Sequence, residues 1–135
     1  MKYNKDYGDW KKMAEILNYL DISIPCKVGE IWWISFGINI GIEIDGKGDN
    51  FERPAIIIKK FNKDHLWVVP ITHTKLIKDK IHVPIENSLL SSNSVAIITQ
   101  LHTISNKRLM HKIGILDQYQ FIEIIKGING ILLNK

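Results

Sequence analysis

Residues 45–72 read DGKGDNFERPAIIIKKFNKDHLWVVPIT, and they specify the centre of the fold. Asp45–Asn50 favour turns and solvent, whereas the next run, Ala55–Phe61, is apolar and rich in β-branched isoleucine, as expected of a strand. After a short polar turn, Leu66–Thr72 has the same character, and two such runs in succession predict a β-hairpin. Arg53 stands at the start of the first strand, where a loop meets the predicted core.

Three further short runs are rich in aromatic and β-branched residues and predict more strands around the hairpin. They are Glu30–Phe36, Ile81–Ile85 and Val95–Ile104, the last being the longest. Pro70 lies inside the second strand of the hairpin, which indicates an edge position or a bulge, because proline cannot donate to a ladder.

Amphipathic patterns near both ends of the chain predict helices. The first has Trp10, Met13, Ala14, Leu17 and Leu20 at helical spacing, with Asp9 as its predicted N-cap. The second begins with a capping box of Asp117 and Gln120, and its apolar face comprises Phe121, Ile124, Ile125, Ile128, Ile131 and Leu132. Five or six short strands with two flanking helices predict a mainly β, α+β domain, built as a small barrel or strongly bent sheet. A parallel α/β fold is disfavoured because helices do not alternate with the strands.

The composition is typical of one globular domain, with 45% hydrophobic and 24% charged residues in 135. The single cysteine, Cys26, cannot form an internal disulfide, and no Cys/His spacing suggests zinc, so a reducing cytoplasm is expected. No apolar run reaches membrane-spanning length, and the first residues lack the apolar core of a signal peptide. The net charge of +4 permits a polyanionic partner without requiring one.

The predicted hairpin would bring two polar side chains together in a way that suits a chemical role. If its strands pair around the turn, Arg53 and Thr72 are neighbours across the ladder. A guanidinium donates two parallel hydrogen bonds and a threonine hydroxyl a third, which suits a phosphate. The alternative is that neither residue has a functional role. Arg53 would then be a solvated residue at a strand end, and Thr72 would be present because threonine favours β-strands.

Other polar residues follow the same strand ends. His73 and Thr74 close the hairpin, and Gln100 and His102 lie two apart on the longest strand, so both are expected on one face. Histidines titrate near neutrality and can serve as acid or base. Gln100 interrupts an apolar run, and satisfied structural hydrogen bonding is the competing explanation for it.

Several familiar catalytic motifs are missing from the sequence. It has no phosphate-binding glycine loop, no GxSxG elbow, no HExxH and no paired cysteines, so neither metal-based catalysis nor a cofactor is expected. The long glycine-bearing segment Gly37–Glu52 is unusual for a compact domain, and loops of this length are often functional.

Six short motifs occur in one order that resembles the MazF/PemK family of toxin ribonucleases. They are VGEIWWISFG, the glycine-rich loop ending in ERPAIIIKK, VVPIT, VAIITQLHTI, NKRLMHKIG and a final helix, together covering Val28 to the C-terminus. The resemblance implies an SH3-like barrel over residues 28–135, preceded by an extra helical segment over residues 1–27. It also implies a cytoplasmic homodimer that is inhibited by a cognate antitoxin, whose acidic, partly disordered tail would lie across the basic RNA groove.

The implied activity is metal-independent cleavage of single-stranded RNA, usually mRNA, by attack of a ribose 2′-OH on the adjacent phosphorus. The products are a 2′,3′-cyclic phosphate and a 5′-OH end. The family's catalytic arginine and hydroxyl residue match Arg53 and Thr72 here. The loop is expected to close on RNA, with Asp45, Lys47, Asn50 and Glu52 as its candidate contacts.

Two positions depart from the family pattern. Two residues after the glutamine, where the family usually has an arginine, this chain has His102. Directly after Thr72, where the family commonly has a small hydroxyl residue, this chain has His73. We hypothesise that His73 or His102 shares the acid–base work, with Thr74 and Gln100 as further candidate RNA contacts. A non-catalytic SH3-like module that binds nucleic acid or protein is the alternative function. A toxin of related fold that acts on a protein target is a third.

Overall fold

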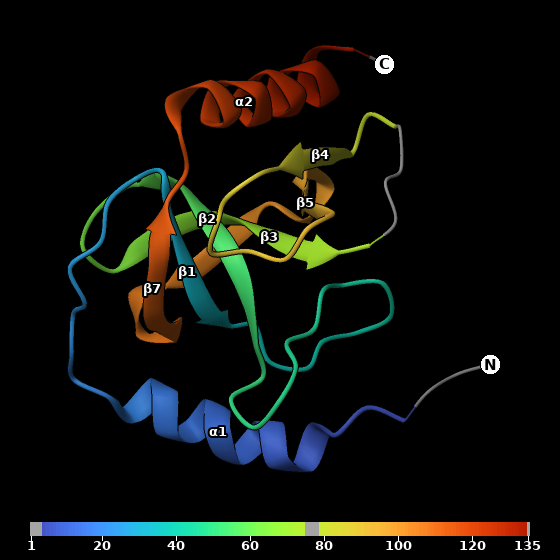
Figure 1. Cartoon of the computed structure of the whole chain (residues 1–135). Coiled ribbons are helices and arrows are strands. Elements are labelled where there is room, and N and C mark those ends of the chain that lie inside the picture. Colours follow the sequence, from blue (N-terminus) through green and yellow to red (C-terminus); the bar gives the residue numbers. More distant parts are fainter. Residues whose placement is uncertain (1–3, 75–78, 135) are drawn as a thin grey trace.

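The computed structural model describes residues 4–74 and 79–134, which form an antiparallel sheet with two α-helices (Figure 1). The strands are β1 (Glu30–Ser35), β2 (Glu52–Lys60), β3 (His65–His73), β4 (His82–Ile85), β5 (Ser94–Ile97), β6 (His102–Ser105) and β7 (Leu109–Ile115). The helices are α1 (Tyr7–Tyr19) and α2 (Gln118–Leu133), with 3₁₀ turns η1 (Ile98–Gln100) and η2 (Asn106–Arg108). The predicted α+β class is confirmed.

The sheet is built around the β2–β3 hairpin, as predicted. Its order is β4-β5-β3-β2-β1-β7, and β6 also pairs with β3. Ala55 lies opposite Pro70, and Ile56 opposite Val69. The described strands leave the hydrogen-bonded order open between β4 and β7, so closure into an SH3-like barrel stays a prediction.

The edge position predicted from Pro70 is wrong, because β3 has partners along both of its edges. β2 covers one edge, whereas β5 pairs with Ile71–His73 and β6 with His65–Val68 along the other. Pro70 falls between these two partner strands, where no ladder bond from its missing N–H is required.

The single strand predicted for Val95–Ile104 is also wrong. It divides into β5, the 3₁₀ turn η1 and β6, so that one chain segment pairs with both halves of the bent strand β3. The sequence analysis missed β7 altogether. This strand pairs with β1 through two register irregularities, and its residues do not alternate cleanly between apolar and polar.

The helices agree with the sequence in their positions but not in every detail. α1 is capped by Asp6, whose carboxylate accepts a bond from the Asp9 amide at 3.1 Å, so Asp9 is not the N-cap. α2 begins as predicted, with the Asp117 carboxylate accepting from the Gln120 amide at 2.9 Å. The face predicted for α2 is buried at Ile124 and partly buried at Phe121, Ile125 and Ile128, whereas Ile131 and Leu132 are exposed.

The core consists of two clusters, on opposite faces of the central strands. Alternate residues of β2 belong to different clusters, Ile57 to one and Ile56 to the other, as the period of a strand requires. The cluster that contains Ile56 is covered by α2 through Ile124. Figure 1 shows α2 at one end of the molecule and α1 at the other. Within the described parts of the chain, no helix has the length and apolar character needed to span a membrane.

Candidate active site

The hairpin brings together the pair predicted from its register. Arg53 Nη1 donates a hydrogen bond of 3.3 Å to Thr72 Oγ1. β2 begins at Glu52, so Arg53 lies within the strand rather than ahead of it, and its backbone is paired with Ile34 of β1. The ladder with β1 therefore fixes the backbone from which the guanidinium extends.

The guanidinium also contacts the loop that precedes it. Arg53 Nε donates to the main-chain oxygen of Asp45. Together with the bond to Thr72, this contact holds the guanidinium between the loop and β3. The sequence offered no signal for the contact with Asp45, because the acceptor is a backbone oxygen.

Arg53 and Thr72 line a groove of about 510 Å³ between the loop, β3 and the residues that follow β4. The other lining residues are Trp33, Lys47, Gly48, Glu52, Pro54, Ile71, His73, Leu89, Leu90, Ser91 and Ser94. Cationic and hydroxyl groups thus share the groove with an apolar wall. This combination suits a nucleotide, which carries both an anionic phosphate and a flat, largely apolar base.

Glu52 differs from the other charged residues of this groove. Its Oε2 is buried and accepts no hydrogen bond from any residue that the structure describes. Its backbone is held by a two-bond bridge with Lys47, of 3.0 and 2.9 Å. An unsatisfied carboxylate oxygen is costly to bury, and a catalytic role is one explanation for such a group in a native protein.

The remaining residues of the predicted loop and hairpin take several places. His73 is exposed at the end of β3, in the groove. Thr74 donates its amide to the Asn93 carbonyl at 3.2 Å, and Asn50 accepts a bond from Ser35 Oγ at 2.7 Å through its own carbonyl. Asp45 forms an ion pair with Lys5, 3.1 Å between Nζ and Oδ2.

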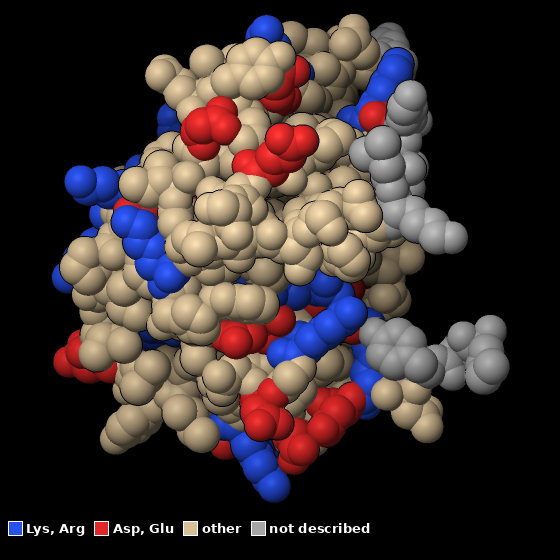
Figure 2. All heavy atoms as spheres, viewed as in Figure 1, with Lys and Arg blue, Asp and Glu red and all other residues tan. Residues whose placement is uncertain are grey.

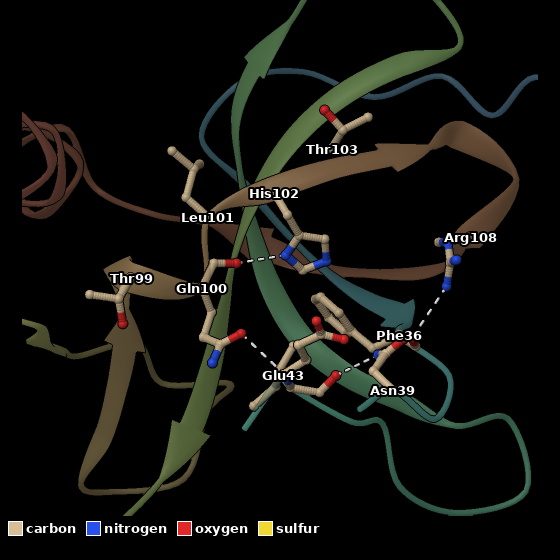
Figure 3. Close-up of a pocket in the computed structure, with 10 residues that line it drawn as sticks. Phe36, Asn39, Glu43, Thr99, Gln100, Leu101, His102, Thr103 and Arg108 are labelled. Atoms are coloured by element: carbon tan, nitrogen blue, oxygen red, sulfur yellow. Dashed lines mark hydrogen bonds between the residues drawn. The ribbon is translucent and has the colours of Figure 1, made fainter. Parts of the chain in front are cut away.

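Gln100 and His102 line a second pocket of about 280 Å³, apart from the groove of Arg53 (Figure 3). The prediction that both project from one strand face is wrong, since Gln100 lies in η1 and only His102 in β6. Gln100 Oε1 accepts from the Ile44 amide at 3.2 Å, and its Nε2 donates to the Ile42 carbonyl at 2.9 Å. These bonds support the structural explanation for Gln100.

His102 is held in one orientation within this second pocket. Its Nδ1 lies 2.6 Å from the Gln100 carbonyl, and its ring packs edge-on against Phe36 with centroids 5.3 Å apart. A carbonyl only accepts, so Nδ1 carries the proton of this bond. Figure 3 shows Asn39, Glu43 and Arg108 around the same hollow.

Arg108 is a residue that the sequence analysis did not single out, although it belongs to the NKRLM motif. Its Nη1 donates to the carbonyls of Ser35 and Phe36 at 3.0 and 3.3 Å, and its guanidinium lies 5.5 Å from the centre of the Trp10 ring. Burial lowers the pKa of Arg108 from its ordinary value. Because an arginine pKa starts above 12, the group stays charged and ties α1 to the end of β1.

Charges of both signs occur on the surface near the loop. In the view of Figure 2, basic and acidic atoms lie side by side over the lower part of the molecule, where Figure 1 places α1 and the loop after β1. Among the described residues, no group of three or more His, Cys, Asp or Glu side chains is arranged to hold a metal ion.

Comparisons with known proteins agree with this architecture. MazF from Deinococcus radiodurans superposes with a TM-score of 0.66 at 18% identity, covering 85% of this chain and 100% of that one. An endoribonuclease from Mycobacterial species, solved with its cognate antitoxin, gives a TM-score of 0.62 at 13% identity over 82% and 98% of the two chains. Mycobacterium tuberculosis toxin MazF-mt6 gives 0.58 at 20% identity over 78% and 98%. These likenesses establish the fold.

A search of curated proteins found no significant match. The family model described as PemK-like, MazF-like toxin of type II toxin-antitoxin system matches residues 27–132, which begin after α1 and include strands β1 to β7 and most of α2. With so much of the chain matched, and with the Arg53–Thr72 pair in the groove, the protein belongs to the PemK-like, MazF-like toxin family of type II toxin-antitoxin systems.

Proposed function

We propose that the chain is a toxin endoribonuclease that cleaves single-stranded RNA without a metal ion. In the proposed reaction, a ribose 2′-OH attacks the adjacent phosphorus, the bond to the 5′-oxygen of the next nucleotide breaks, and the products are a 2′,3′-cyclic phosphate and a 5′-OH end. The observation that carries the proposal is the Arg53–Thr72 contact on the wall of a groove with room for a nucleotide. The family match supports it independently.

Arg53 stabilises the negative charge that develops on the phosphorane oxygens. Its Nη1, now bonded to Thr72, is the donor that would turn to a phosphate oxygen, with the Thr72 hydroxyl as a second donor. Its Nε stays on the Asp45 carbonyl and keeps the guanidinium in place. Arginine itself does not transfer the proton, because its pKa exceeds about 12.

Proton transfer therefore needs a second group in the same groove. His73 and Glu52 both line it, whereas His102 lines the other pocket. We therefore favour His73 over His102 as the histidine that shares the acid–base work, and Glu52 is a further candidate through its unsatisfied oxygen. A His73→Asn variant separates them: it flattens the pH–rate profile around neutrality if His73 titrates in the reaction, and leaves it unchanged if Glu52 is the base.

The wider assignments follow from the same proposal. We propose that the chain acts in the cytoplasm as a homodimer with an SH3-like core over residues 28–135, and that α1 belongs to an additional N-terminal segment, residues 1–27. A cognate antitoxin would cover the groove with an acidic segment that competes with RNA for Arg53 and Lys47. Lys47, Asn50 and Asp45 of the loop, and Thr74, Gln100 and His102 elsewhere, remain candidate RNA contacts.

The test is incubation of purified protein with a mixed pool of single-stranded RNA in excess EDTA. Discrete fragments with 5′-OH ends are expected, and Arg53→Ala should reduce cleavage by a factor of at least about 100, the usual cost of removing an oxyanion donor. Lys63→Ala, which removes one exposed charge from the hairpin turn, is the matched control and should cleave normally. RNA that is bound but left intact would instead favour the non-catalytic binding module.

A further inference from the structure

We propose that the segment around the start of α1, through Lys5 and Trp10, positions the Arg53 guanidinium by holding the loop that precedes β2. The contacts that carry this inference do not depend on the activity, whereas its catalytic consequence rests on the proposed function. Lys5 and Trp10 lie far from Arg53 in the chain and outside the region that the family model matches. They are positioning residues and touch no reacting atom.

Lys5 binds the loop through its side chain at several points. Its Nζ forms the ion pair with Asp45 and donates to the carbonyls of Asn39 and Gly41 at 2.7 and 3.2 Å. The Lys5 and Asp45 side chains are only 9% and 11% exposed, so solvent screens their attraction less than that of a surface pair. The Tyr7 hydroxyl adds a bond of 3.0 Å to the same Asn39 carbonyl.

Asp45 connects this anchor to Arg53. Its carboxylate receives the Lys5 ammonium and, through Oδ1, the Asn39 amide at 2.6 Å, while its carbonyl accepts from Arg53 Nε. Side chain and main chain of one residue therefore join the N-terminal segment to the guanidinium. The further bond from Arg53 Nη1 to Thr72 extends the connection into the groove.

Trp10 holds the two ends of the loop together. Its ring packs edge-on against Phe51, with centroids 5.5 Å apart, and covers Gly37 so closely that an added Cβ there would lie 2.2 Å from the ring. Gly37 in turn donates its amide to the Phe51 carbonyl at 3.1 Å. Phe51 is two residues from Arg53, so a shift of the ring would move the start of β2.

The test uses the fact that Arg53 and Arg108 are the two arginines of the chain. The full-length ¹⁵N-labelled protein should give two arginine Nε–H signals, and Arg53→Lys identifies the one from Arg53. In Lys5→Met we expect exchange of the Arg53 Nε–H with water to accelerate about tenfold as the bond to Asp45 loosens, with Arg108 unchanged. Lys12→Met removes the same charge from an exposed position of α1 and is the matched control. An unchanged Arg53 signal in Lys5→Met would overturn the proposal.

Cleavage kinetics test the catalytic consequence. Lys5→Met should lower kcat about tenfold with little change in KM, since misplacement of a positioned group affects the transition state more than binding. Lys5→Arg should restore most of the rate. The Lys5→Met/Asp45→Asn double variant should be no worse than the poorer single variant if both act through their pair. A changed Arg53 signal with normal kcat would overturn the catalytic half. A wild-type protein that cleaves no RNA would refute the proposed function, while the Arg53 signal would still decide the positioning.

Discussion

Glu30, the first residue of β1, offers a sharp test of how a buried charge contributes to this fold. The residue is 6% exposed, and three donors converge on its carboxylate. Oε1 accepts from the Lys27 amide at 2.7 Å and from Trp32 Nε1 at 3.1 Å, while Oε2 lies 2.7 Å from Lys112 Nζ. Burial by itself would raise the pKa of Glu30, but these bonds outweigh it and lower the pKa from its ordinary value.

We expect Glu30→Ala to lower the free energy of unfolding by about 2–6 kcal/mol at pH 7, the cost of leaving the Trp32 Nε1 and Lys27 amide donors unpaired at about 1–3 kcal/mol each. Lys112 adds little to this cost, because its side chain is 41% exposed and regains water when the pair is broken. Lys112→Met instead leaves the buried Glu30 Oε2 without its donor and should cost about 1–3 kcal/mol. Urea unfolding of the three proteins measures the differences.

The pH dependence has a definite sign. A carboxylate whose pKa is lower in the folded state contributes stability that is present above the unfolded pKa, about 4.3, and is lost as the pH falls through the folded value. The difference in the free energy of unfolding between wild type and Glu30→Gln should therefore have its full size near pH 6 and become smaller below about pH 4. A difference that stays constant from pH 6 to pH 3, or grows in acid, would refute this assignment of the Glu30 carboxylate.

Three further predictions concern α2 and the loop. Gly130→Ala should raise the free energy of unfolding by about 0.5–1 kcal/mol, because a Cβ there meets only ordinary contacts. Gly127→Ala should raise the free energy of unfolding by less, or lower it, because its Cβ would lie 2.9 Å from Ile98 Cδ1. Ile124→Ala, at a fully buried position, should cost about 2–5 kcal/mol in the same urea assay. Gln100→Ala should accelerate hydrogen exchange of the Ile44 amide, which it now binds, and exchange as slow as in the wild type would contradict this role.

Local patterns predicted the hairpin and the contact between Arg53 and Thr72 because both depend on neighbours in sequence. The turn pairs Lys60 with Leu66, and an irregularity between Ile57 and Lys59 then shifts the register by one residue, so that Ala55 lies opposite Pro70 and Arg53 reaches Thr72. The capping box of α2 succeeded for the same reason, since Asp117 and Gln120 are three residues apart. The N-cap of α1 was misplaced because Asp6 and Asp9 both precede the apolar face, and only the observed bond distinguishes them.

The failures arise where distant partners choose the structure. Val95–Ile104 has the residues of one strand, but β3 bends and requires two shorter partners along one edge, which a one-dimensional pattern cannot express. The same break moved Gln100 off a strand and placed it in a pocket with His102, away from Arg53. No periodicity could have revealed the bond between Arg53 and Asp45 either, because it uses a main-chain oxygen.

The contacts that Lys5, Trp10 and Gln100 make with the loop after β1 change what is expected of that loop. A long glycine-bearing segment suggested a flap that closes on RNA as a whole, yet Lys5, Trp10 and Gln100 hold it from separate elements. Ile40 and Ile42 are exposed apolar side chains of this loop, at 75% and 93%. The backbone beside these two side chains is itself bound, because Lys5 donates to the carbonyls of Asn39 and Gly41 and Gln100 donates to that of Ile42. The anchored loop therefore supports a groove whose wall at Arg53 and Thr72 is preformed, since Asp45 of the same loop binds the Arg53 guanidinium.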